Sequence, residues 1–428
     1  MSPDAPAGLP RLLATPPHNH DDHVARYGAL PELRRRAERA EFVAMVERSG
    51  LRGRGGGGFP TGRKLRAVAD GGRHPVVVAN GAEGEPASRK DCALLRCAPH
   101  LVIDGAAVAA RAVGAEEIHF VVDRGDGAGR DALEVALRAR VGEMPRPGAW
   151  RVAVVPSRYV AGEESAVVNF LNGGDAKPVS VPPRPYERGV RGRATLVQNV
   201  ETLANLALVA RFGAEWYGSV GTTDEPGSVL TTTVGAVTRP GVYEFALGTP
   251  FTRVIESAGG PTEPLGALLV GGYFGTWLSL EAAEGLVLAH GVLRQAGATL
   301  GCGVVAALPM LSCGVVETAR VARYLASESA GQCGPCVHGL AAIASALEAL
   351  AAGVAPRGTV ATVERWLSDV AGRGACHMPD AVVGFVRSSL AVFADDYVLH
   401  ERKGPCAATA HPPVLPLPDP ATRDRSWR

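Results

Sequence analysis

The sequence predicts a protein of the α/β class, in which a Rossmann-like parallel sheet is followed by a β-grasp-like domain and a C-terminal four-helix bundle. Short apolar runs alternate with helical patterns in the first half of the chain, which is typical of parallel sheets. Valine- and threonine-rich runs separated by a turn signal come next. Four helical patterns with short connections come last and favour a bundle.

Composition narrows the class of protein. The chain has 428 residues, 46% of them hydrophobic and 20% charged, which is typical of a globular protein of roughly two to four domains. Because the net charge is only +1, composition gives no reason to expect binding to nucleic acid or to anionic membranes. No apolar run reaches the ~18 residues of a membrane span, and the N-terminus lacks the apolar core of a secretory signal. We therefore expect a cytoplasmic protein whose eight cysteines are thiols or metal ligands.

Composition shifts divide the chain into five segments. Both ends are rich in proline and polar residues, so we expect them to be disordered. The predicted segments are a tail at 1–26, an α/β domain at 27–215, a β-grasp-like domain at 225–290, a helical domain at 300–400 and a tail at 404–428.

The elements follow from apolar periodicity. In the first domain we expect strands at 75–80, 117–122 and 150–155, and helices at 30–49, 99–112, 130–140, 166–172 and 203–212. In the second domain we expect strands at 228–234, 242–245 and 267–270. In the third domain we expect helices at 315–327, 337–352, 360–370 and 381–393.

A glycine-rich stretch, Leu51–Leu65, lies between the first predicted helix and the first predicted strand. It contains Gly53 and Gly55 to Gly58 and ends with Lys64 and Leu65. Exposed backbone N–H groups can surround an anion, and Lys64 can neutralise it, so the stretch suits a phosphate of a nucleotide or flavin. It also matches the G-x-G-x-x-G pattern of dinucleotide sites but follows a helix instead of a strand. A flexible linker would have the same glycine content.

Two further polar loops follow predicted strands. Gly81–Pro86 comes directly after the strand at 75–80, and Tyr159–Ser165 follows the strand at 150–155. Open α/β sheets bind ligands at the carboxyl ends of their strands. Together with the glycine-rich stretch, these loops predict a single site.

Cysteines gather in the helical domain. Cys333 and Cys336 have the C-x₂-C spacing, and Cys376 lies on a later helix connection, which suits zinc or an iron–sulfur cluster. A thioredoxin-type redox pair would need a βαβ context. His338 and His377 are candidates for a fourth ligand. The remaining cysteines show no ligand spacing and are interpreted as structural or incidental: Cys92, Cys97, Cys302, Cys313 and Cys406.

Five motifs in register carry a family resemblance: Arg52–Lys64, Asn80–Asp91, Tyr159–Ser165, Asn199–Leu203 and Glu328–Gly339. Through them the chain resembles the NADH-binding, FMN-containing flavoprotein subunit of respiratory complex I, the F or 51-kDa subunit. Relatives of that subunit occur in NAD-linked hydrogenases and formate dehydrogenases. The resemblance runs from about Tyr27 to about Val398.

The resemblance implies a set of site residues. FMN would be bound by Gly53, Arg54, Gly55, Gly56, Gly57, Gly58, Lys64, Asn80, Glu83, Gly162, Glu163, Glu164, Asn199 and Thr202. NADH would stack on the flavin near Phe59 and Glu85, with Glu85 positioning the nicotinamide. The middle domain would be an SLBB-like β-grasp module, and the bundle would hold a 4Fe-4S cluster through Cys333, Cys336 and Cys376.

The sequence departs from the family pattern at several positions. Ala330 replaces the first cluster cysteine, so three thiolates remain for a 3Fe-4S cluster, a 4Fe-4S cluster with a substitute ligand, or no cluster. Ala82 replaces an aspartate near FMN. Val181 and Arg184 replace a lysine and a phenylalanine that help to hold NADH, and Arg184 would suit the 2′-phosphate of NADPH.

The predicted function is an FMN-dependent NAD(P)H dehydrogenase module that passes single electrons to an iron–sulfur partner. The resemblance implies a 2Fe-2S ferredoxin-like protein as that partner, and a place at the periphery of a membrane complex without insertion into the membrane. The departures leave two alternatives. One is a degenerate, non-catalytic homologue kept for structure or assembly. The other is an FMN protein that ferredoxin reduces in place of NADH.

Overall fold

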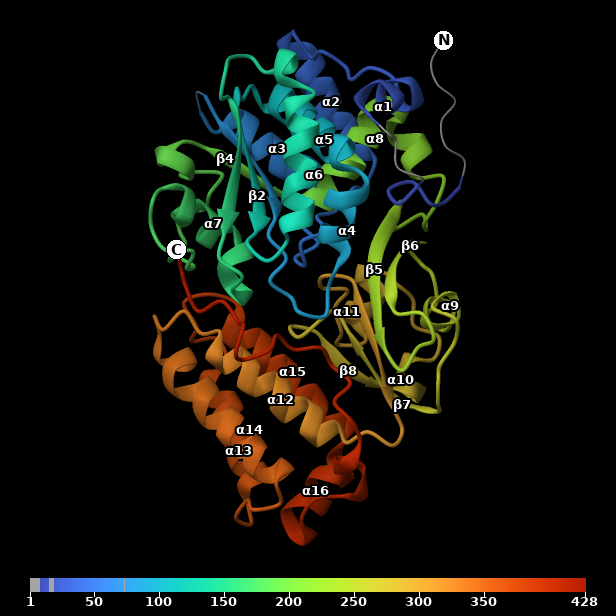
Figure 1. Cartoon of the computed structure of the whole chain (residues 1–428), viewed down its shortest axis with the longest axis vertical. Helices are drawn as coiled ribbons and strands as arrows, with labels where there is room; N and C mark the ends of the chain where they lie inside the picture. Colours follow the sequence, from blue (N-terminus) through green and yellow to red (C-terminus); the bar gives the residue numbers. More distant parts are fainter. Residues whose placement is uncertain (1–7, 15–18, 73) are drawn as a thin grey trace.

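The computed structural model describes residues 8–14, 19–72 and 74–428. Figure 1 shows an elongated molecule with the α/β domain at one end. A second sheet, which has five strands, and a helical bundle lie side by side at the other end. The predicted fold class, a parallel-sheet domain followed by a β-grasp-like domain and a helical domain, is confirmed.

The α/β domain is built on a parallel sheet with the strand order β3-β2-β1-β4. Its strands are β1 (Val76–Gly81), β2 (Glu117–Asp123), β3 (Trp150–Val155) and β4 (Thr195–Asn199). Its helices are α1 (His20–Tyr27), α2 (Arg36–Arg48), α3 (Thr61–Asp70), α4 (Lys90–Cys97), α5 (Pro99–Val113), α6 (Gly127–Arg138), α7 (Glu164–Leu171) and α8 (Val200–Tyr217). All four carboxyl ends therefore meet at one edge of the sheet.

Alternate side chains of β1 enter two different cores. Val77 and Ala79 join the large core that includes α5 and α8, whereas Val76 and Val78 pack in a smaller core with Val167 of α7. Helices thus cover both faces of the sheet, which explains why the strand reads as a continuous apolar run.

Besides α1, three helices or strands of this domain were not predicted. α3 begins inside the glycine-rich stretch, α4 follows the loop after β1, and β4 completes the sheet. The apolar part of β4 is only Leu196 and Val197, because polar residues of the strand lie at its ends. Such a short run does not distinguish a strand from a loop.

The predicted disordered tail at 1–26 is wrong for its described part, while residues 1–7 and 15–18 lie outside the described residues. Residues 20–26 belong to α1, and Asn19 caps that helix. Nε2 of His23 lies 2.6 Å from a carboxylate oxygen of Asp104 on α5, and both side chains are buried. A buried polar contact to a carboxylate fixes the helix against the domain.

The second sheet has the order β6-β5-β9-β7-β8. Its strands are β5 (Ser228–Gly235), β6 (Gly241–Ala246), β7 (Leu265–Val270), β8 (Thr276–Ser279) and β9 (Val304–Pro309), accompanied by helices α9 (Phe251–Ser257), α10 (Leu280–Ala283) and α11 (His290–Gln295). β9 pairs with both β5 and β7. The predicted second domain ends at residue 290 and so leaves out β9, the central strand of this sheet. The reason is that β9 comes last among the strands in the chain.

The bundle contains α12 (Gly314–Ser327), η4 (Pro335–Leu340), α13 (Ala341–Ala351), α14 (Thr359–Val370), α15 (Met378–Val392) and α16 (Ala394–Lys403). The four predicted helices match α12, η4 with α13, α14 and α15. η4 is a π-helix that carries Cys336, and π-turns are frequent at functional sites. α16 extends the bundle beyond the prediction.

The predicted disordered tail at 404–428 is also wrong. Leu415 is buried, and its backbone N–H donates to Glu317 of α12 at 3.0 Å. Farther along, Asp424 pairs with Arg124 at 2.8 Å, and the guanidinium of Arg158 lies 4.0 Å from the ring centre of Trp427. The tail therefore runs from the bundle to the α/β domain, beside which the C-terminus lies in Figure 1.

In the part of the chain that the structure describes, no single helix has the length and apolar character to cross a membrane. Only α4 and α5 taken together meet that standard, and a bend of 96° separates them.

Candidate functional site

The glycine-rich stretch forms a closed loop. The N–H of Gly53 donates to the carbonyl of Phe59 at 2.9 Å, and the N–H of Thr61 donates to the carbonyl of Leu51 at 2.9 Å. An added Cβ at Gly55 would lie 3.3 Å from Cβ of Asn199, so the loop packs against the carboxyl end of β4. It is therefore an ordered part of the domain, not a flexible linker.

The middle of this loop keeps its backbone open. Among the described residues, no atom lies within 4 Å of an added Cβ at Gly57, and the nearest to one at Gly56 is 4.0 Å away. Gly56 has a positive φ of 105°, which favours glycine. Phe59, at the end of the loop, is 56% exposed although it is aromatic. Open backbone next to an exposed ring suits a ligand with a flat ring and a phosphate.

Helix α3 begins where the loop ends. Its first turn contains Arg63 and Lys64 and no carboxylate, and no side chain caps its N-terminus. Free N–H groups and positive charge at a helix start bind anions. Nζ of Lys64 lies 2.7 Å from Glu164 in a partly exposed pair, so Lys64 faces the loop after β3. Arg184 lies 3.9 Å from the same carboxylate.

The loops after β1 and β3 interlock. Nδ2 of Asn80 donates to the carbonyl of Gly162 at 2.8 Å. An added Cβ at Gly84 would lie 2.5 Å from the carbonyl oxygen of Tyr159, and one at Gly162 would lie 2.7 Å from that of Ala82. Glycine is therefore required at both positions. The loops that were predicted to form one site do come together.

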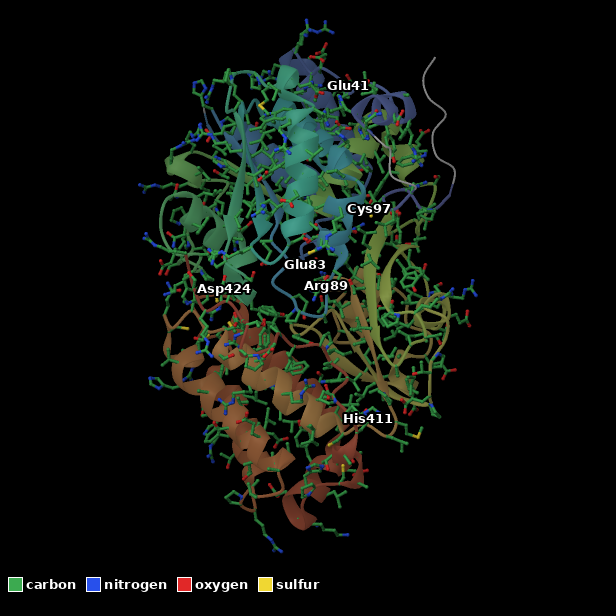
Figure 2. The ribbon with its side chains drawn as sticks, in the orientation of Figure 1. Glu41, Glu83, Arg89, Cys97, His411 and Asp424 are labelled. Atoms are coloured by element: carbon green, nitrogen blue, oxygen red, sulfur yellow. The ribbon has the colours of Figure 1, made fainter. Side chains whose placement is uncertain are left out.

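Several predicted ligands make hydrogen bonds within the protein. Glu83 accepts from the N–H groups of Asp91 and Cys92 at the start of α4, and Glu163 accepts from those of Ser165 and Ala166 at the start of α7. These carboxylates cap helices. Glu164 is the carboxylate that faces Lys64 instead. Figure 2 shows Glu83 at the end of the α/β domain that faces the other two domains.

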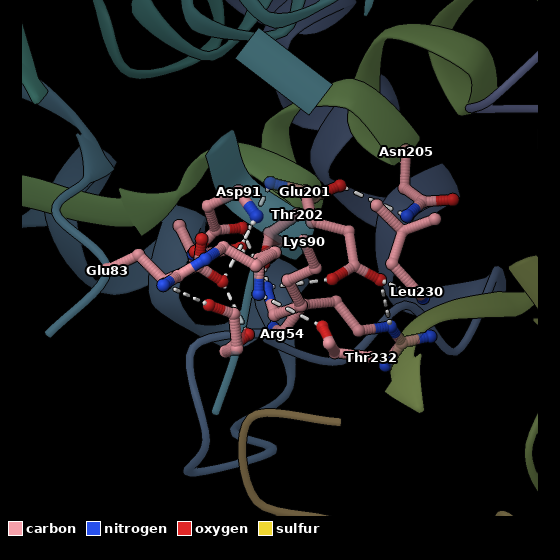
Figure 3. Close-up of polar contacts among 12 residues, drawn as sticks. Arg54, Glu83, Lys90, Asp91, Glu201, Thr202, Asn205, Leu230 and Thr232 are labelled. Carbon is pink, nitrogen blue, oxygen red and sulfur yellow. Dashed lines mark hydrogen bonds and ion pairs between the residues drawn. The ribbon is translucent and has the colours of Figure 1, made fainter. Parts of the chain in front are cut away.

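The side chain of Arg54 points away from the open backbone of the glycine loop, toward α8 and β5. Its buried guanidinium donates to the carbonyl of Ser228 at 2.9 Å and to the hydroxyl of Tyr217 at 3.1 Å. Its backbone N–H donates to Oγ1 of Thr202 at 2.8 Å. The side chains of Arg54 and Thr202, both predicted cofactor ligands, thus hold the glycine loop on α8 and β5 (Figure 3).

A buried ion network lies beneath the loop (Figure 3). Nζ of Lys90 is 2.7 Å from Asp91 and 2.9 Å from Glu201, and Asp91 accepts from Nδ2 of Asn199 at 2.6 Å. Glu201 also lies 3.7 Å from Arg54. Burial raises the pKa of Asp91 to about 6, while Asp91 and Glu201 keep the pKa of Lys90 above its ordinary value against the effect of burial.

Lys90, Asp91 and Glu201 belong to the motifs quoted for the family resemblance, but no role was predicted for them. The available signal was the Lys90–Asp91 pair at the start of the short helix before Leu94 and Leu95. A charged pair is rarely fully buried unless partners compensate it. The compensating partners, Glu201 and Asn199, lie more than 100 residues away, so the ion network could not be predicted from the sequence.

Glu85 lies where the α/β domain meets the second sheet. It accepts from the hydroxyl of Tyr159 and from the N–H of Tyr273, each at 2.7 Å, and from the N–H of Ala87 at 3.1 Å. Burial raises the pKa of Glu85 to about 7. Glu85, which is predicted to position the nicotinamide, can therefore gain or lose a proton near neutral pH.

The three predicted metal-ligating cysteines line one small pocket, with a cavity volume of about 20 Å³. Cys333, Cys336 and Cys376 share it with Ala330, which replaces the fourth cysteine of the family motif. Burial and the neighbouring Cys333 raise the pKa of Cys336 to about 12. Three thiols around a shared space suit an iron–sulfur cluster with one corner lacking a cysteine. Val160, from the loop after β3, forms another wall.

We predict that Glu201→Gln destabilises the protein by about 3 to 5 kcal/mol, because it leaves the positive charges of Lys90 and Arg54 under-compensated in the interior. The measurement is urea unfolding followed by circular dichroism. Glu256→Gln, at the exposed pair with Arg253, is the matched control and should cost about 0.5 kcal/mol or less. Equal losses in the two variants would contradict this role of the network.

We also predict a pH effect from Glu85. Its folded pKa of about 7 exceeds the ordinary 4.5, so its contribution to stability is complete below about pH 4.5 and is lost as the pH rises toward 7. Between about pH 5 and about pH 7 the wild type should lose about 2 kcal/mol more than Glu85→Gln. Unfolding curves at both pH values test this. Glu116→Gln, at an exposed carboxylate, is the control and should keep the wild-type dependence of stability on pH. If Glu85→Gln also keeps that dependence, the prediction is refuted.

Comparison with family models gives three matches. Residues 46–208 match the Nuo51 FMN-binding domain, and residues 230–271 match the SLBB domain. Residues 317–400 match the NADH-ubiquinone oxidoreductase-F iron-sulfur binding region. The first match covers the glycine loop and the polar loops around it, and the last covers the three cysteines.

Relatives match along most of the chain. An F subunit of the NADH-quinone oxidoreductase of Rhizobium meliloti is 30% identical over 86% of this chain and 90% of its own length. The F subunit of the Aquifex aeolicus enzyme is 32% identical over 74% of this chain and 75% of its own length. The structure of an NAD+-reducing [NiFe]-hydrogenase in the air-oxidized state superposes with a TM-score of 0.80 at 31% identity, covering 87% of this chain and 64% of the hydrogenase chain. The chain belongs to the family of NADH-quinone oxidoreductase F subunits.

Proposed function

We propose that this chain is an FMN-dependent NAD(P)H dehydrogenase module that passes electrons singly to an iron–sulfur partner. The observation that carries the proposal is the open glycine loop with Lys64 beside it, placed against the interlocked loops after β1 and β3. FMN, when bound, accepts two electrons from a nicotinamide as hydride and releases them one at a time.

The residues of the site have separate tasks in this proposal. The start of α3 and Lys64 bind the phosphate, and the backbone of the glycine loop surrounds it. Asn80, whose Nδ2 joins the loop after β1 to the carbonyl of Gly162 in the loop after β3, would lie near the ribityl chain and the flavin ring. The exposed ring of Phe59 is available to stack on the nicotinamide nucleotide.

Glu85 holds the position where the nicotinamide would approach. Its carboxyl group is tied to Tyr159 and to the backbone of Tyr273, so it links the site to the second sheet. Hydride transfer needs no proton from the protein, and Glu85 therefore positions the substrate. Its pKa of about 7 makes that hydrogen bonding depend on pH.

In this proposal, electrons leave the flavin through a cluster in the cysteine pocket. Val160 and Pro178 of the α/β domain form part of its wall, so the pocket borders the loop after β3, which also belongs to the proposed flavin site. We propose a 3Fe-4S cluster or a 4Fe-4S cluster whose fourth iron is readily lost, since Ala330 has no donor atom to hold it. A 2Fe-2S ferredoxin-like protein or subunit is the proposed acceptor, within a cytoplasmic assembly peripheral to a membrane complex.

The first test of the proposal is flavin binding by Lys64→Met. Loss of the ammonium group should weaken FMN binding tenfold or more, about 1.4 kcal/mol or above, because a charge-assisted contact to phosphate is lost. Fluorescence quenching of free FMN by the flavin-depleted protein measures the affinity. The exposed Lys403→Met is the matched control.

An affinity for FMN that is the same in Lys64→Met, Lys403→Met and the wild type would refute the phosphate role of Lys64. Riboflavin, which lacks the phosphate, provides a second check. It should bind the wild type and Lys64→Met equally, because the ammonium group has no partner on that ligand.

The second test concerns the cluster. We predict that the anaerobically purified wild type carries fewer than four irons per chain, and that Ala330→Cys raises the iron and acid-labile sulfide content. Ala375→Cys, beside Cys376 in the same pocket, is the matched control and should leave the content unchanged. A full complement of iron in both the wild type and Ala330→Cys would show that position 330 does not limit the cluster.

A further inference from the structure

Two cysteines that showed no ligand spacing in the sequence meet a buried histidine at the far end of the bundle. The ligand atoms of Cys313, His400 and Cys406 all lie within 4.8 Å of one another. Sγ of Cys313 is 3.4 Å from Nε2 of His400, and both side chains are buried. This group lies outside the pocket of Cys333 and Cys336. The sequence spacing of Cys313 and Cys406 does not reveal this cluster, because the two cysteines lie far apart in the chain.

The imidazole is oriented as a metal ligand would be. Nδ1 of His400 lies 3.0 Å from the carbonyl oxygen of Leu350 and donates its hydrogen to it. Nε2 accepts the N–H of Cys406 at 3.3 Å and lies 3.4 Å from Sγ of Cys313, so its lone pair faces the two cysteines, and a bound metal would take the place of these hydrogen bonds. A backbone carbonyl that accepts from Nδ1 and so fixes the tautomer is typical of metal-bound histidine.

The donor set selects the metal. Two thiolates and one imidazole nitrogen match the Cys and His ligands of zinc, which prefers four ligands in a tetrahedron. Cys406 is only half-buried, so a water molecule can reach the fourth position from its side. We propose that Cys313, His400 and Cys406 form a zinc site separate from the flavin site and from the iron–sulfur cysteines.

The position of the three ligands gives this site a structural role. Cys313 is the N-cap of α12, directly after β9, and His400 lies in the last turn of α16. Cys406 opens the tail that continues past His411 to Asp424 at the α/β domain, as Figure 2 shows. Zinc would fasten the beginning of this tail to the junction between the second sheet and the bundle.

The test is the zinc content of the full-length protein, measured by elemental mass spectrometry after dialysis. The wild type should retain about one zinc per chain. Cys406→Ser should lose most of it, whereas Cys97→Ser, a matched change at another half-buried cysteine, should keep it. Cys333→Ser should lower iron and leave zinc unchanged, which separates this site from the cluster.

A measurement on the wild type covers the case that Cys406→Ser fails to fold. Replacing zinc with cobalt should give the thiolate-to-metal absorption and the strong visible bands of tetrahedral cobalt, and a chelator should speed proteolytic cleavage between residues 404 and 415. Zinc absent from the wild type, zinc equal in Cys406→Ser and the wild type, or a Cys313–Cys406 disulfide found by peptide mass spectrometry would each overturn the proposal.

Discussion

The buried ion network of Arg54, Lys90, Asp91 and Glu201 is the interaction on which the geometry of the site depends (Figure 3). Its members come from the glycine loop, the start of α4 and the start of α8. The two positive and two negative charges compensate one another, which is necessary because burying an isolated charge is costly. A glycine loop has few side chains with which to anchor itself, so its position is set by the charges beneath it.

In this arrangement, the residues that support the loops differ from the groups that are available to bind a ligand. Arg54, Glu83 and Glu163 hold backbone segments in place, whereas Lys64 and Glu164 form a partly exposed pair and the backbone of Gly56 and Gly57 is open. Motif matching treats all of them as ligands because they are neighbours in the sequence. The structure separates them by what each side chain already contacts, and rigid support of this kind is what lets a binding loop keep its shape.

Local signals were enough to predict the strands β1, β2 and β3, the polar loops after them and the helices of the bundle. A run such as Val76 to Ala79 or a Gly/acid loop can be recognised within a few residues. Apart from the meeting of the polar loops, contacts between distant segments could not be predicted. β9 joins the second sheet after all its partners, and Cys313 and His400 meet across 87 positions. The terminal segments were misjudged because their composition does not reveal the surfaces on which His23 and Leu415 pack.

The central claim is that nicotinamide reduces a flavin bound at the glycine loop. The most direct test is an anaerobic titration of the purified, FMN-loaded protein with NADH and, separately, NADPH, followed by visible spectroscopy. The account predicts that at least one nucleotide bleaches the flavin absorption to the extent that dithionite does. Flavin that dithionite bleaches while both nucleotides leave it oxidised would contradict the account and favour reduction by ferredoxin, and a protein that cannot bind FMN would indicate a non-catalytic homologue.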